Sequence, residues 1–166
     1  MGTGGPNPAA GAGIALASVI KTFCGERHVS KLVEGAAFGK YNERFDKTRQ
    51  FDWLSKDRQV QDEYIADRYC GFHFTVSALR DLVVLNKKSN DGDWLDSFDP
   101  SLPTLFVSGA EDPVGGYGEG VKKVYDALTE RGCNVGMKLY DSCRHEILDE
   151  TCRAEVIEDI LEFIGK

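Results

Sequence analysis

Long apolar runs and an excess of basic residues are both missing from this 166-residue sequence. No stretch of about 20 apolar residues occurs, and no basic-then-apolar leader opens the chain, so we expect neither a membrane helix nor a secretion signal. The 20 Lys+Arg are outnumbered by 27 Asp+Glu, and no basic stripe could neutralise phosphates. We therefore expect a soluble cytoplasmic protein that has no nucleic-acid partner and no integral membrane segment.

Paired cysteine motifs are absent as well. The five cysteines include no Cys-x-x-Cys pair, and an odd number cannot close entirely into intrachain disulfides. Cys143, His145 and Cys152 come nearest to a zinc-ligand group, but their spacing matches no standard zinc site. We expect free thiols in a reducing compartment, and neither a metal nor another cofactor.

The first part of the chain is patterned for helices. Residues 1–13 are rich in glycine, proline and alanine and are predicted to form an entry loop. Residues 14–95 form a second zone in which apolar residues recur near a period of 3.6. Helices are predicted there at Ile14–Phe23, Ser30–Phe38, Gln59–Tyr69 and Thr75–Lys87. No strand is predicted before residue 100.

The third zone, residues 96–166, alternates strands and helices. Strands are predicted at 102–107 and 135–139, and helices at 119–131 and 150–164. The last helix is expected to bury Val156, Ile157, Ile160, Leu161 and Ile164. This order predicts an α/β fold with a parallel βαβα unit and a right-handed crossover. Two strands leave an unpaired sheet edge, which natural proteins rarely leave uncovered.

Two loops at the carboxyl ends of these strands carry residues that could do chemistry. Asp112 follows the first strand, and His145 lies between the second strand and the last helix. A carboxylate beside a histidine fixes one imidazole tautomer and stabilises the imidazolium. Taken singly, Asp112 before Pro113 is more easily explained as a turn residue, and His145 equally well as a capping or surface residue. Their order and topology together favour the functional interpretation.

The segments GAEDPVG around Asp112 and CRHEIL around His145 resemble the acid and histidine loops of serine α/β-hydrolases, in the family's chain order. FDWLSKD at 51–57 and YIADRYCGF at 64–72 are similar to the helical cap of monoacylglycerol lipase and lysophospholipase-like members, of the serine aminopeptidase S33 type. The opening GTGGPNP resembles the loop after the family's sixth strand. The resemblance implies a partial α/β-hydrolase fold, in which a helical cap precedes the βαβα unit.

The family's nucleophile motif, Gly-x-Ser-x-Gly, is missing from the chain. None of the nine serines fits it, and Ser108, which follows the first strand, has Phe106 where the first glycine belongs. The earlier strands and the loop that completes an oxyanion hole are also missing. The resemblance thus implies Asp112 and His145 as catalytic residues whose serine partner is not in this sequence.

Three hypotheses follow. The first is an ester hydrolase for lipid-like acyl esters, inactive as this chain alone, whose cap residues Trp53 and Tyr64 could line an acyl-chain pocket or simply form core. The second is a non-catalytic module that self-associates or binds a partner through its open sheet edge. The third is one half of a split hydrolase.

Overall fold

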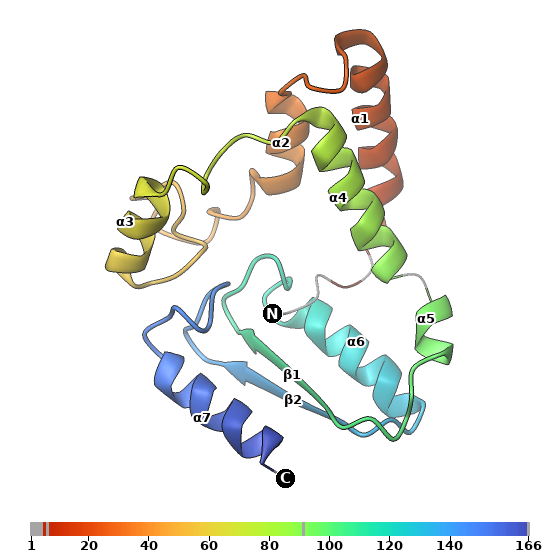
Figure 1. Cartoon of the computed structure of the whole chain (residues 1–166), viewed down its shortest axis with the longest axis vertical. Coiled ribbons are helices and arrows are strands. Elements are labelled where there is room, and N and C mark those ends of the chain that lie inside the picture. The colour runs from red at the N-terminus through yellow and green to blue at the C-terminus, as the bar shows by residue number, and fades with distance from the viewer. Residues whose placement is uncertain (1–4, 6, 91, 166) are drawn as a thin grey trace.

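The computed structural model of the chain describes residue 5, residues 7–90 and residues 92–165. It has a helical part and a small α/β part (Figure 1). The helical part contains α1 (Ala10–Cys24), α2 (Lys31–Phe38), α3 (Arg58–Ala66), α4 (Val76–Ser89) and the short α5 (Asp93–Asp96). The α/β part contains β1 (Thr104–Gly109), α6 (Glu119–Glu130), β2 (Val135–Tyr140) and α7 (Arg153–Ile164).

Helices α2, α3 and α4 begin at residues whose side chains cap them. Ser30 accepts a hydrogen bond from the Val33 N–H ahead of α2, and Thr75 accepts one from Ala78 ahead of α4. Helices α1, α2 and α4 pack against one another around a core of Ala17, Val33, Val76 and Leu79. Burial of this apolar cluster holds the upper part of the molecule in Figure 1 together.

Helix α1 begins earlier than predicted, inside the expected entry loop. Asn7 starts it, because its backbone carbonyl accepts from the Ala10 N–H and its side chain accepts from the Ala9 N–H. Gly13 lies in the helix facing α4, where an added Cβ would lie 4.0 Å from Val83. Glycine in this stretch therefore sits within a packed helix and does not prevent it. The remainder of the predicted loop, residues 1–4 and 6, lies outside the described residues.

The two strands form a parallel sheet, with Thr104 opposite Val135 and Gly109 opposite Tyr140. Figure 1 shows α6 and α7 on either side of the strands, and both arrowheads pointing toward α3 and the chain between α2 and α3. The predicted βαβα unit is confirmed, and among the described residues no strand precedes β1. The loops that follow the strands therefore meet the helical part.

Helix α7 departs from prediction in its start and in its buried face. It begins at Arg153, because the preceding residues form a turn that contains the fully buried Glu150. Val156 is buried, but three apolar residues expected in the core are exposed, namely Ile157, Leu161 and Ile164. The apolar pattern of this helix therefore predicted burial correctly at Val156, where other residues of the chain pack against it.

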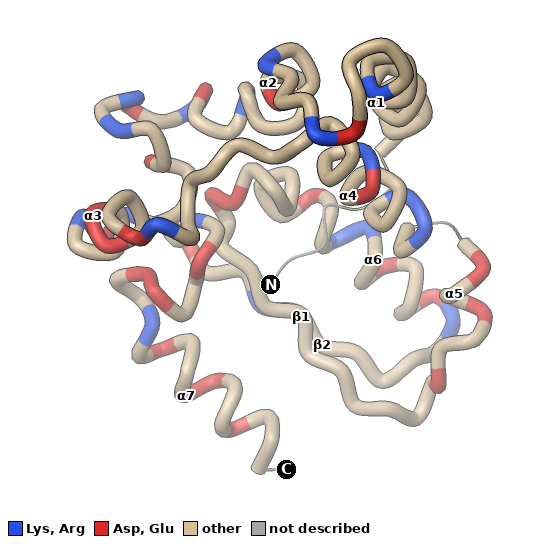
Figure 2. Tube along the Cα trace, turned by 45° about the horizontal axis from the view of Figure 1, so that its top comes forward, with Lys and Arg blue, Asp and Glu red and all other residues tan. Residues whose placement is uncertain are grey.

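Charge is distributed as the composition predicts. Figure 2 shows acidic and basic residues interspersed along the described part of the chain, with no continuous basic stripe. Within the same residues, none of the helices combines the length and the apolar character that crossing a bilayer requires.

Candidate active site

The loop after β1 places Asp112 at the carboxyl end of the sheet. The Asp112 side chain is 1% exposed, and its Oδ1 accepts a hydrogen bond of 2.8 Å from the Val114 N–H. Its backbone carbonyl accepts one of 2.7 Å from Tyr117, which adopts a left-handed φ of 58° between Gly116 and Gly118. These turn contacts fix the carboxylate, so the turn-forming role of Asp112 does not compete with a functional one.

The loop after β2 brings His145 to the same place. Its Nδ1 lies 3.1 Å from both carboxylate oxygens of Asp112, and its side chain is 19% exposed. Because the carboxylate only accepts, Nδ1 carries the proton and the lone pair of the neutral ring is on Nε2. The structure thus joins the two residues that the sequence identified, in the geometry that suits a general base.

A close backbone approach locks the two loops together. The Glu111 N–H donates to the Cys143 carbonyl at 2.9 Å, and the Ala110 N–H donates to the Tyr140 carbonyl at 2.9 Å. A Cβ on Gly109 would lie 2.2 Å from the carbonyl oxygens of both Cys143 and Arg144. Only glycine fits at this end of β1, and it allows Asp112 and His145 to reach each other.

Aromatic side chains of the helical part cover the histidine. The Trp53 ring lies 5.3 Å from the His145 ring and 5.2 Å from the Tyr41 ring, between centroids. Burial, and then the charge of Asp112, raise the pKa of Tyr41 above its ordinary value. Tyr41 belongs to the surroundings of the site and carried no motif by which the sequence could have identified it.

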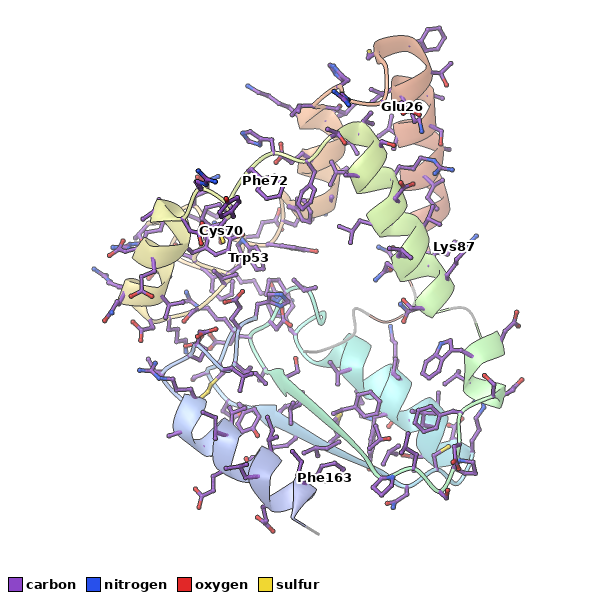
Figure 3. The ribbon with its side chains drawn as sticks, in the orientation of Figure 1. Glu26, Trp53, Cys70, Phe72, Lys87 and Phe163 are labelled. Carbon is purple, nitrogen blue, oxygen red and sulfur yellow. A yellow bond between two sulfur atoms is a disulfide. The ribbon has the colours of Figure 1, made fainter. Side chains whose placement is uncertain are left out.

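Beside these rings lies a cavity of about 690 Å³, within the size range of small-molecule sites. Trp53 and Tyr64 both line it, as do Phe38, Phe51, Phe72 and Phe74. Figure 3 shows Trp53, Cys70 and Phe72 close together, between the helical part and the end of the sheet. Aromatic side chains are prominent in its lining, which also includes Lys31 and Glu34, and Trp53 contacts His145 as well.

The cysteine prediction was wrong for one pair. Cys143 and Cys152 form a disulfide, drawn in Figure 3 at the start of α7, while Cys24, Cys70 and Cys133 are free. Their spacing gave no sign of this, because the turn between His145 and α7 is what folds the chain back on itself. The disulfide closes the loop that carries His145.

Burial also acts on the acid that follows the histidine in the sequence. Burial, and then the charge of Asp149, raise the pKa of Glu146 above its ordinary value. On the far side of the loop, Arg144 stacks on the ring of Phe45 at 4.3 Å. Asp112 is the acid that contacts the His145 ring.

Comparison with known proteins gives this geometry a context. A carboxyl esterase from Bacillus coagulans, solved in complex with glycerol, is 26% identical with a TM-score of 0.85, and the match covers 98% of this chain and 54% of the esterase. A lipase in an open form is 23% identical with a TM-score of 0.78, covering 93% of this chain and 50% of the lipase. A soluble variant of monoglyceride lipase from Saccharomyces cerevisiae is 16% identical with a TM-score of 0.60, covering 99% and 54%.

The chain thus spans about half the length of these solved proteins, and they share with it a partial α/β-hydrolase fold. No curated protein sequence matches it significantly. The model of the S33 serine aminopeptidase family matches residues 6–152 of this chain, and these residues include both site loops. By that match over most of its length, the chain belongs to the S33 serine aminopeptidase family of α/β-hydrolases.

Proposed function

We propose that this chain supplies the acid, the base and the acyl-chain cap of a serine hydrolase that cleaves lipid-like carboxylic esters. The observation that carries the proposal is the contact between His145 Nδ1 and the buried Asp112 carboxylate at the ends of adjacent parallel strands. Lysophospholipids and monoacylglycerols are the substrates we favour, because Trp53, which packs against His145, also lines a cavity rich in aromatic side chains.

The chemistry follows from this arrangement and from a serine supplied by the rest of the hydrolase core. The serine hydroxyl attacks the acyl carbonyl while His145 Nε2 takes its proton, and the Asp112 carboxylate stabilises the imidazolium. His145 then gives the proton to the leaving alcohol. Water, activated by the same nitrogen, releases the acid from the acyl-enzyme and restores the serine.

The chain alone should be inactive as an esterase, because its sequence has neither Gly-x-Ser-x-Gly nor the accompanying oxyanion hole. Mixing it with the part of the Bacillus coagulans esterase that it does not cover tests the proposal. We expect hydrolysis of p-nitrophenyl butyrate only in the mixture, and none when His145→Ala replaces the wild-type chain. Turnover by the chain alone that His145→Ala abolishes would contradict the proposed inactivity.

The acyl-chain cavity can be tested without catalysis. Trp53 and Trp94 are the two tryptophans, so Trp94→Phe leaves the cavity indole as the only one. We expect monoacylglycerols to change its fluorescence, with affinity rising as the chain lengthens, by about 0.8 kcal/mol for each fully buried methylene. Tyr64→Ala should weaken this binding, whereas Tyr125→Ala on α6, outside the cavity, should not.

An assembly role is the second candidate, favoured by the exposed apolar residues of α7. Ile157 is 45% exposed, Leu161 62% and Ile164 72%. If the chain acts as a module of this kind, light scattering should give an oligomer that Leu161→Lys converts to a monomer. A compact monomer that gains activity only with the other half supports the split-hydrolase alternative instead.

The compartment in which the chain works is also open to test. The sequence favours the cytoplasm, whereas a disulfide between Cys143 and Cys152 is typical of oxidising compartments. Rapid alkylation of cell extracts, followed by mass spectrometry of the two cysteines, distinguishes these locations.

A further inference from the structure

Glu150 is an acidic residue near the site that is as deeply buried as Asp112. Taken as whole residues, both are 0% exposed. Its carboxylate accepts hydrogen bonds from three backbone N–H groups, those of Lys56 at 2.9 Å, Arg144 at 3.0 Å and Thr151 at 3.1 Å. Two of these donors lie on the histidine loop, which we define as residues 141–152, and the third lies on the helical part. Glu150 therefore bridges segments that are far apart in sequence.

The segment on the helical side, residues 52–56, forms a platform under the histidine loop. The N–H of Glu146 donates to the Leu54 carbonyl at 2.9 Å, and that of His145 itself donates to the Trp53 carbonyl at 3.4 Å. The platform's Ser55 hydroxyl donates to the Asp149 carbonyl at 3.2 Å. The His145 backbone is thus held to the platform, while its ring is held to Asp112.

The Arg144 side chain adds a tie in the same direction. Its Nη1 donates to the carbonyls of Asp52 and Ser55, the latter at 3.3 Å. The Cys143–Cys152 disulfide cannot tie the histidine loop to the platform, because both cysteines belong to the loop. Among these contacts the Glu150 carboxylate is the only charged acceptor, and charge-assisted hydrogen bonds are roughly twice as strong as neutral ones.

We propose that Glu150 is a positioning residue, which clips the histidine loop to the platform and so keeps His145 in line with Asp112. The effect of Glu150 on catalysis rests on the proposed function, but its role in holding the histidine loop to the platform does not. Because residues 52–56 belong to the cap, the same contact makes the cap and the general base move as one unit. A displacement of about 1 Å in such a group can cost on the order of a hundredfold in rate.

Glu150→Gln tests the proposal in the full chain, since it keeps the size of the side chain but faces a neutral amide toward the three N–H donors. Amide hydrogen exchange at His145 and Glu146 should become at least about tenfold faster, as expected when charged hydrogen bonds are lost. The deshielded Nδ1 proton of His145 should broaden or disappear, while amides of α6 keep their exchange rates. Asp141→Asn, an exposed acid of the same loop, is the matched control and should change neither.

A purely stabilising role for Glu150 gives a different pattern. Exchange would then accelerate in α6 as much as in the histidine loop, and the Nδ1 proton would stay sharp. Unchanged exchange at His145 and Glu146 in a folded Glu150→Gln chain would also overturn the proposal. Ser55→Ala, which removes one platform tie and retains Glu150, should show a smaller effect of the same kind.

The wild-type chain provides a test that needs no variant to fold. Under native conditions with low denaturant, the amides of Lys56, Arg144 and Glu146 should open with one common free energy. Separate opening of Lys56 from the other two would refute the clip.

In the reconstituted enzyme, Glu150→Gln should lower kcat about a hundredfold and leave KM unchanged. Failure of the wild-type mixture to hydrolyse esters would count against the proposed function only. The exchange data decide the role of Glu150 in either case.

Discussion

Replacing Asp112 with asparagine should move the proton of the neutral His145 ring from Nδ1 to Nε2, without leaving empty space at residue 112. Asparagine has the same shape, so its Oδ1 can still accept from the Val114 N–H, as the carboxylate does at 2.8 Å. Its Nδ2 then replaces Oδ2, which lies 3.1 Å from His145 Nδ1, while Oδ1 stays engaged by the Val114 N–H. Two donors cannot share this contact, so Nδ1 gives up its proton and becomes the acceptor.

The proton moves to Nε2, which is the nitrogen that must take a proton from the serine. The same exchange in a trypsin-type triad, with geometry intact, lowers kcat about 10⁴-fold. At 1.36 kcal/mol for each factor of ten, this is about 5.5 kcal/mol of transition-state stabilisation. We expect a loss of this size in the reconstituted hydrolase, with KM little changed.

Nitrogen-15 NMR of the imidazole rings reads the tautomer directly, in the chain alone. Only three histidines contribute signals, and His145→Gln identifies the one that matters. Wild-type protein should show the proton on Nδ1 and the asparagine variant on Nε2, while His28 and His73 stay unchanged. An asparagine variant that retains the Nδ1 proton, or full activity in the mixture, would refute the assignment of Asp112 as the orienting acid.

Three further predictions concern the thiols, a buried tyrosine and the core. Without reductant, the denatured chain should expose three reactive thiols to Ellman's reagent, and five after reduction; five at the outset would exclude the disulfide. Burial, and then the hydrogen bond to Asp159, raise the pKa of Tyr140 to about 12, so its stabilising contribution is complete below the ordinary value near 10 and lost as pH rises through about 12. Ultraviolet titration should show a tyrosine that ionises near pH 12 and that Tyr140→Phe removes; titration of all six tyrosines near 10 would contradict this. Leu128→Ala, at a fully buried site of α6, should lower the free energy of unfolding by about 3 kcal/mol in urea titrations, against at most about 0.5 for Leu85→Ala, which is 65% exposed; equal losses would contradict the assigned burial.

The sequence predicted the parts of this fold that depend on local pattern. Apolar β-rich runs placed β1 and β2, and the loops after them placed Asp112 and His145 at one edge, because parallel strands end together. The contact between Asp112 and His145 then follows from topology.

What the sequence did not reveal depends on contacts between distant segments. Glu150 lies five residues after His145, and its position in the sequence is that of an ordinary acidic residue in the first turn of a helix. Its actual partners include Lys56, which no periodicity connects to it. Tyr41 is hidden for the same reason, since its proximity to Trp53 arises from the turn after α2.

The exposed apolar face of α7 is a surface that the rest of this chain leaves uncovered. Ile157, Leu161 and Ile164 recur at the spacing of one helical face, yet they are exposed, while Val156 packs against the sheet. Among the described residues, each strand of the parallel pair has only the other as its neighbour, so each has one open edge. The solved α/β-hydrolases contain roughly as much chain again beyond the matched half.

An additional sheet segment paired at such an edge would extend the sheet and bring helices over exposed apolar surface. The same pairing would set new strand ends beside Asp112 and His145, which is where a nucleophile must stand to reach Nε2. On the proposed function, completing the hydrophobic core and completing the triad would be a single structural event, and a partner half that restores activity should also protect α7 from hydrogen exchange.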